Sequence, residues 1–196
     1  MLEKKEKPKN LDPIYIDSNK FTATYEFSNM FYEHIKGRIT ESNTVVVLCI
    51  GSDRATGDSL GPLIGYKLST SKEVLNEKII LYGTLESPVH AKNLSETISA
   101  IYSQHEDPFV IAIDACLGRV SYIGYLGIGE GSLCPGAGIK KELPSIGDVY
   151  IIGIVNSSTI SDIVVLQNTR LSVVMKMADV ISNALLSVFQ KIYDEY

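Results

Sequence analysis

The chain has 196 residues, of which 45% are hydrophobic and 21% charged, and its formal net charge is −5. This composition is typical of a globular protein with its own core, and the negative charge excludes nonspecific attraction to nucleic acid or to an anionic membrane surface. No apolar run reaches the roughly 18 residues of a membrane-spanning helix. The Lys- and Glu-rich residues 1–10 lack the apolar segment of a secretory signal. We therefore expect a cytoplasmic protein with no nucleic-acid or membrane partner.

Hydrophobic periodicity divides the chain into an N-terminal arm and one domain. Residues 1–24 are polar, irregular and interrupted by prolines, which predicts a flexible arm. Residues 25–196 show no internal repeat and no linker, which predicts a single domain. In chain order, the predicted elements are a helix over 25–39, a strand over 44–50, a helix over 60–70, a short strand over 78–82, a helix over 89–104, a strand over 109–113, a twisted or edge strand over 121–128, a glycine-rich loop over 129–138, a strand over 148–155, and helices over 159–166 and 170–193.

The alternation of strands and helices predicts the fold class. The strands over 44–50 and 109–113 are unbroken apolar runs, as expected for strands buried on both faces of a parallel sheet. We therefore expect an α/β protein, a three-layer α/β/α sandwich with a mainly parallel, mixed central sheet. In open sheets of this kind, ligands bind outside the carboxyl ends of the strands.

Two aspartates follow predicted strands and are the main catalytic candidates. Asp58 lies in the segment 50–62, after the first apolar strand, and Asp114 directly follows the second. If these strands are neighbours, the two carboxyl groups approach each other. Two carboxylates at close range cannot both ionise cheaply, so one pKa rises and the pair can hold a proton near neutrality. One member can then act as general base on a water while the other protonates a leaving group.

Simpler roles for both aspartates remain open. Asp58 precedes the residues Ser59–Pro62 and could be the N-cap of the helix that begins there. Asp114 could do no more than accept hydrogen bonds in a turn. The glycines within 51–61 match neither the dinucleotide-binding pattern nor the phosphate-binding loop, so a nucleotide is not expected.

Four further residues are candidates for substrate binding. Glu86 and His90 follow the short strand over 78–82 and could face the same end of the sheet. Gly136 and Gly138 belong to the glycine-rich loop, whose backbone N–H groups could point at a developing oxyanion. A plain turn-rich connection would have the same composition as this loop.

The cysteines and histidines give no pattern of their own. Cys49, Cys116 and Cys134 are odd in number and unpatterned, which is typical of reduced thiols in the cytoplasm. Cys116 or Cys134 could act as a nucleophile with His90 as its base, but nothing in the sequence couples them. The histidines show no paired-ligand spacing. We therefore expect no metal and no other cofactor.

The segments around both aspartates resemble the germination protease of spore-forming bacteria. The residues Thr-Gly-Asp-Ser-Leu-Gly-Pro at 56–62 are similar to its Pro-Asp-Ala-Leu-Gly-Pro segment, and residues 110–115 to its second aspartate segment. Residues 134–138 resemble its Pro-Gly-Ser-Gly loop, and 147–155 the strand that follows. This resemblance covers residues 45–159. A smaller, related kind of sporulation protein resembles nearly the whole chain.

The resemblance implies a fold shared with hydrogenase maturation proteases. It also implies that Asp58 and Asp114 are the two carboxylates of an aspartate-dependent endopeptidase, which in the germination protease acts on small, DNA-coating spore proteins. In maturation proteases the matching acids help bind nickel together with a loop histidine, and Gly136 occupies that position here. A nickel-dependent protease is therefore not expected.

Two functional hypotheses follow. The first is a sporulation-associated endopeptidase of the germination-protease type, with a protein or peptide substrate such as a small spore protein, in which Asp58 and Asp114 activate water. The second is a catalytically inactive member of the same family that binds a peptide or a partner protein during spore formation. The sequence does not predict the oligomeric state.

Overall fold

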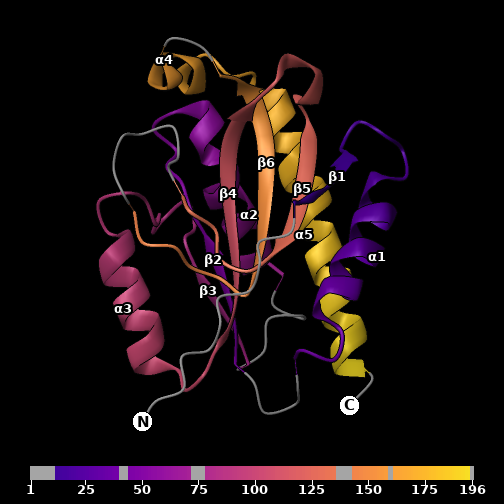
Figure 1. The fold of residues 1–196 in the computed structure, drawn as a ribbon, viewed down its shortest axis with the longest axis vertical. Coiled ribbons are helices and arrows are strands. Elements are labelled where there is room, and N and C mark those ends of the chain that lie inside the picture. The colour runs from indigo at the N-terminus through magenta and orange to yellow at the C-terminus, as the bar shows by residue number, and fades with distance from the viewer. Residues whose placement is uncertain (1–11, 40–43, 72–77, 136–142, 159–160, 195–196) are drawn as a thin grey trace.

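The computed structural model describes residues 12–39, 44–71, 78–135, 143–158 and 161–194 (Figure 1). Its elements in chain order are β1 (Ile14–Asp17), α1 (Ala23–Ile35), β2 (Val45–Cys49), the short 3-10 helix η1 (Thr56–Ser59), α2 (Leu60–Ser69), β3 (Ile79–Tyr82), α3 (Leu94–Gln104), β4 (Phe109–Gly118), the 3-10 helix η2 (Val120–Tyr122), β5 (Tyr125–Glu130), β6 (Val149–Ser157), α4 (Asp162–Gln167) and α5 (Leu171–Asp194).

The described strands form a six-stranded sheet in the order β1-β5-β6-β4-β2-β3. Strands β3, β2, β4 and β6 run parallel to one another, whereas β5 is antiparallel to β6 and β1 is antiparallel to β5. Strand β2 lies between β3 and β4, with Val45 opposite both Ile79 and Phe109. The sheet is therefore mixed and mainly parallel, as predicted.

Helices cover the sheet on both faces because alternate residues of each strand point to opposite sides. On one face, Val45 and Val47 belong to the same buried cluster as residues of α1, α2 and α5. On the other face, Val46 and Leu48 pack in a second cluster with Leu94 of α3. The three layers visible in Figure 1 confirm the predicted α/β/α sandwich.

Helix α5 is the longest element of the described structure. By length and composition alone its residues Leu171–Tyr193 could cross a membrane. However, the side chains on one face of α5, including Val174, Met177, Ile181 and Leu185, are buried in the core. Packing against the sheet and its neighbouring helices accounts for the apolar character of α5.

The prediction of a flexible arm over residues 1–24 is wrong for the described part of that segment, residues 12–24. Residues Ile14–Asp17 form strand β1, which pairs with β5, and α1 already begins at Ala23. The side chain of Ile16 is buried in the core. A strand of this length has too few residues to show a period, and its partner lies more than 100 residues away in the sequence. Residues 1–11 of the arm lie outside the described residues.

Strand β4 is longer than the sequence predicts. It continues past Ile113 to Gly118 because β6 pairs with it throughout, with a register shift between Cys116 and Leu117. Asp114 therefore lies inside a strand rather than after one. The twisted or edge strand predicted over 121–128 is β5, which is an inner strand because β1 covers its outer side.

Between β2 and the first turn of α2, two glycines pack against backbone with no room for a side chain. A Cβ atom on Gly61, in the first turn of α2, would lie 2.1 Å from the carbonyl oxygen of Ile50. Gly51 has φ of +141°, and a Cβ there would lie 2.1 Å from the carbonyl oxygen of Asp58. These glycines therefore serve close backbone packing.

We expect Gly61→Ala to lower the free energy of unfolding by about 3 kcal/mol, because the added methyl group must displace backbone rather than a flexible side chain. Urea denaturation measures this loss. Gly37→Ala is the control: Gly37 has φ of +70° but no atom within 4 Å of an added Cβ, so only conformational strain of about 1 kcal/mol is expected. Equal losses in the two variants would contradict the packing argument.

Candidate active site at the carboxyl ends of the parallel strands

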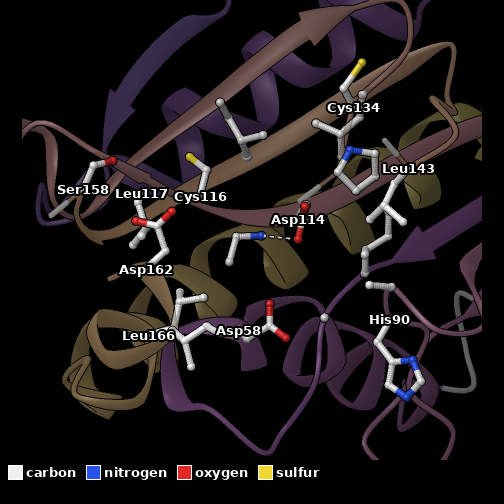
Figure 2. Close-up of a pocket in the computed structure, with 18 residues that line it drawn as sticks. Asp58, His90, Asp114, Cys116, Leu117, Cys134, Leu143, Ser158, Asp162 and Leu166 are labelled. Carbon is white, nitrogen blue, oxygen red and sulfur yellow. Dashed lines mark hydrogen bonds between the residues drawn. The ribbon is translucent and has the colours of Figure 1, made fainter. Parts of the chain in front are cut away.

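A cavity of about 460 Å³ opens at the carboxyl ends of β2, β4 and β6 (Figure 2). Its lining residues are Ile50, Gly51 and Asp58 after β2, His90 and Ala91 before α3, Asp114–Leu117 of β4, Leu133, Cys134, Pro135 and Leu143 between β5 and β6, Ile152 of β6, and Ser158, Asp162, Ile163 and Leu166 after it. This is the end of a parallel sheet at which ligands are expected to bind.

Asp114 reaches the cavity from within strand β4. It lies opposite Ile152 of β6, and only 8% of its surface is exposed. Its Oδ1 accepts a hydrogen bond of 2.8 Å from the backbone N–H of Ala115. This bond fixes the orientation of the carboxyl group. Because Asp114 is inside a strand, the simpler interpretation as a turn residue does not apply.

Asp58 reaches the cavity from the 3-10 helix η1. Its backbone carbonyl accepts a hydrogen bond of 2.9 Å from the N–H of Ser52, which closes the loop after β2. The N-cap of α2 is Ser59, without a side-chain capping bond, so Asp58 is not the cap that its sequence context allowed.

Burial raises the pKa of Asp58 to about 6. A hydrogen bond from the Ser52 backbone and the charge of His90 act in the opposite direction, but they are smaller effects. The sequence argument expected a neighbouring carboxylate to raise a pKa in this pair. For Asp58 the largest cause is instead the loss of contact with water.

The cavity brings together three of the residues predicted from the sequence, and Figure 2 shows how they lie. The carboxyl groups of Asp58 and Asp114 project into its central part. His90 lies at one end of the cavity, and Asp162 lies toward the other. The predicted residue Glu86 is exposed and does not line the cavity. Its loop turns that side chain to solvent. Gly136 and Gly138 lie outside the described residues.

The thiol groups that line the cavity are poorly suited to nucleophilic catalysis. Burial, and secondarily the charge of Asp114, raises the pKa of Cys116 to about 12. A thiol with so high a pKa has almost no thiolate near neutral pH. Cys134 is exposed, and His90 lies at the end of the cavity away from Cys116.

The sequence interpretation missed the wall formed by α4 and the segment before it. Asp162, Ile163 and Leu166 line the cavity together with Ser158. Asp162 follows β6 much as Asp58 follows β2, so the rule that directs attention to the ends of parallel strands could have found it. The sequence alone did not show that β6 is the next strand beside β4.

A family model matches residues 15–184 of the chain. The chain belongs to that family, described as a protein of unknown function (DUF1256). It is also 54% identical over 141 residues to the uncharacterized protein YyaC of Bacillus subtilis (strain 168), an alignment that covers 72% of this chain and 67% of YyaC. YyaC is the smaller protein that the sequence resembled, and the resemblance is confirmed over 72% of the chain, whereas a role in sporulation stays a prediction. The relation to the germination protease stays a prediction.

The fold is similar to that of a solved structure, the NiFe hydrogenase maturation protease HycI from Thermococcus kodakarensis KOD1. The TM-score is 0.51, and the match covers 82% of this chain and 99% of HycI at 17% sequence identity. This likeness confirms the predicted fold.

The described residues of the site do not fit the nickel site that the resemblance to maturation proteases implies. Within the described ranges, no three His, Cys, Asp or Glu side chains are placed to hold a metal ion. The position of the loop histidine expected from the maturation proteases is occupied by Gly136. The chemistry of the site is therefore derived from its carboxyl groups.

We expect Asp58→Asn to stabilise the protein at pH 8 but not below pH 4. The protonated Asp58 contributes stability that is fully present below the ordinary pKa of 3.8 and is lost as the pH rises through about 6. Since one pKa unit corresponds to about 1.4 kcal/mol, replacing the buried carboxylate should raise the free energy of unfolding at pH 8 by about 1–3 kcal/mol. Urea denaturation at several pH values measures the difference.

The matched control for this prediction is Asp53→Asn, a change at an exposed residue in the same loop. Because Asp53 is exposed, this change should alter the free energy of unfolding at pH 8 by less than about 0.5 kcal/mol. A parallel pH dependence of the parent protein and Asp58→Asn would show that Asp58 titrates normally.

Proposed function

We propose that the protein is a sporulation-associated endopeptidase in which Asp58 and Asp114 hydrolyse a peptide bond of a protein or peptide substrate. The observation that carries the proposal is the shared cavity: a carboxyl group with a pKa near 6 and a second, buried carboxyl group project into the same space. The resemblance of both segments to the germination protease supports it. The structural similarity to HycI, a maturation protease, supports it as well.

The environments of the two carboxyl groups give them different roles. Burial favours the protonated form of Asp58, so Asp58 is the general acid. Asp114, whose Oδ1 accepts the N–H of Ala115, is then the general base. Asp114 takes a proton from a water molecule as the oxygen of that water bonds to the peptide carbonyl carbon. Asp58 gives its proton to the leaving nitrogen as the carbon–nitrogen bond breaks.

The walls of the cavity support such a reaction. Leu117, Leu133 and Leu143 give it apolar sides that limit the access of bulk water. The described lining residues include three aspartates, Asp58, Asp114 and Asp162, and no lysine or arginine. The charge of the cavity therefore favours neutral or cationic peptide segments over acidic ones.

We expect the purified protein to produce discrete fragments from a spore-protein extract, read by mass spectrometry. Asp58→Asn and Asp114→Asn should each cleave at least about 100-fold more slowly, because each loses one proton-transfer group. Asp53→Asn, an exposed change in the same loop, is the control and should cleave like the parent. Undiminished cleavage by both site variants would exclude the aspartate mechanism. If neither the parent nor any folded variant cleaves, but all of them bind a peptide from the extract, the protein is a binding module.

We also expect the rate of cleavage to fall as the pH rises through about 6, because Asp58 must be protonated to act as the acid. A fluorogenic peptide that spans the identified cleavage site allows kcat/KM to be measured between pH 4.5 and 8. A rate that instead rises through this range would show that the roles of Asp58 and Asp114 are reversed.

A further inference from the structure

Helix α4 forms a wall of the cavity and packs against the 3-10 helix that carries Asp58 (Figures 1 and 2). Gly57, the residue before Asp58, belongs to this contact. A Cβ atom on Gly57 would lie 2.7 Å from Thr169 Oγ1, 2.8 Å from Leu166 Cδ2 and 3.0 Å from Leu166 Cα. The backbone next to Asp58 therefore lies directly against α4, and Leu166 lines the cavity beside Asp58.

A small network of polar side chains joins the end of α4 to strand β6. The hydroxyl of Thr169 donates a hydrogen bond of 2.9 Å to the carbonyl of Val165 and accepts one of 3.2 Å from Nδ2 of Asn156. The same amide donates to the Val165 carbonyl at 3.4 Å. Asn156 belongs to β6, so the network ties the end of α4 to the central sheet. A helix of six residues has little stability of its own and needs such an anchor.

We propose that Thr169 and Asn156 are positioning residues of the site, which hold α4 against Gly57 so that Leu166 covers Asp58. Thr169 is 6% exposed and does not line the cavity, so it acts through α4 and not by touching a substrate. The proposed effect of Thr169 and Asn156 on the environment of Asp58 is inferred from the structure and does not depend on the proposed function. Their effect on peptide cleavage rests on the proposed function.

The proposal has a measurable consequence because the pKa of Asp58 is raised by burial. If α4 moves away, water reaches the carboxyl group and its pKa falls toward the ordinary value. The other titratable groups that line this cavity are His90, Asp114, Cys116, Cys134 and Asp162. A change at Thr169 adds or removes no charge, so a shift would report the position of the wall.

The test is a titration of Asp58 by NMR in protein labelled with ¹³C at the aspartate carboxyl groups, with Asp58→Asn to identify the signal. Thr169→Val removes the hydroxyl while keeping the shape of the side chain, and we expect it to lower the pKa of Asp58 by about one unit. Thr169→Ser keeps the hydroxyl, so Asp58 in this variant should titrate as it does in the parent. Val164→Ala alters an exposed side chain of the same helix and is the control.

A second variant approaches the same contact from the other side. Gly57→Ala forces α4 away from η1 and should lower the pKa of Asp58 in the same direction, so it decides the matter if Thr169→Val fails to fold. An unchanged titration of Asp58 in folded Thr169→Val or Gly57→Ala protein would overturn the proposal. The titration needs no substrate, so a lack of peptidase activity in the parent would count against the proposed function alone. If the parent is active, the fall in its rate with pH should begin about one unit lower in Thr169→Val.

Discussion

The close approach of Gly61 to the backbone of Ile50 is the contact on which the site depends. It lets α2 begin directly against the end of β2, with no side chain between helix and strand. The intervening loop must then fold back tightly, and the hydrogen bond between Ser52 and the Asp58 carbonyl closes it. The carboxyl group of Asp58 is thereby fixed at the carboxyl end of the sheet, where it shares a cavity with Asp114.

The buried carboxylate of Asp58 lowers the stability of the folded chain, and apolar burial elsewhere in the fold offsets this loss. An ionised carboxyl group with a pKa near 6 is less stable in the folded chain than in water at neutral pH. The core on the α5 side of the sheet and the smaller cluster beneath α3 supply the compensating apolar burial. A residue that costs stability at this position is typical of a site kept for chemistry rather than for folding.

The shared fold is evidence for the architecture of the protein, whereas the side chains of the site are evidence for its reaction. The likeness to the maturation protease HycI establishes a common architecture at 17% sequence identity. Folds of this kind host many functions, so the reaction has to be argued from the side chains. In this chain the described residues do not gather a metal-binding set, whereas two carboxyl groups in unlike environments project into the cavity.

The sequence by itself determined the buried strands, the fold class and the two central aspartates. Unbroken apolar runs such as 44–50 are local signals, and an acid after such a run can be recognised without knowing its neighbours. Only the tertiary structure decided which strands are neighbours, and therefore that Asp114 lies within β4 because β6 pairs beyond it. It also placed β1 beside β5 and left Glu86 outside the cavity.

The cause of the raised pKa of Asp58 was likewise beyond the reach of the sequence. Burial depends on what packs over a group, and here the cover includes Leu166, which follows Asp58 by more than 100 residues. The network of Asn156 and Thr169 that holds this cover in place has no local signature either. Periodicity and composition describe how a segment folds, whereas the environment of a charge is set by segments that meet only when the sheet has assembled.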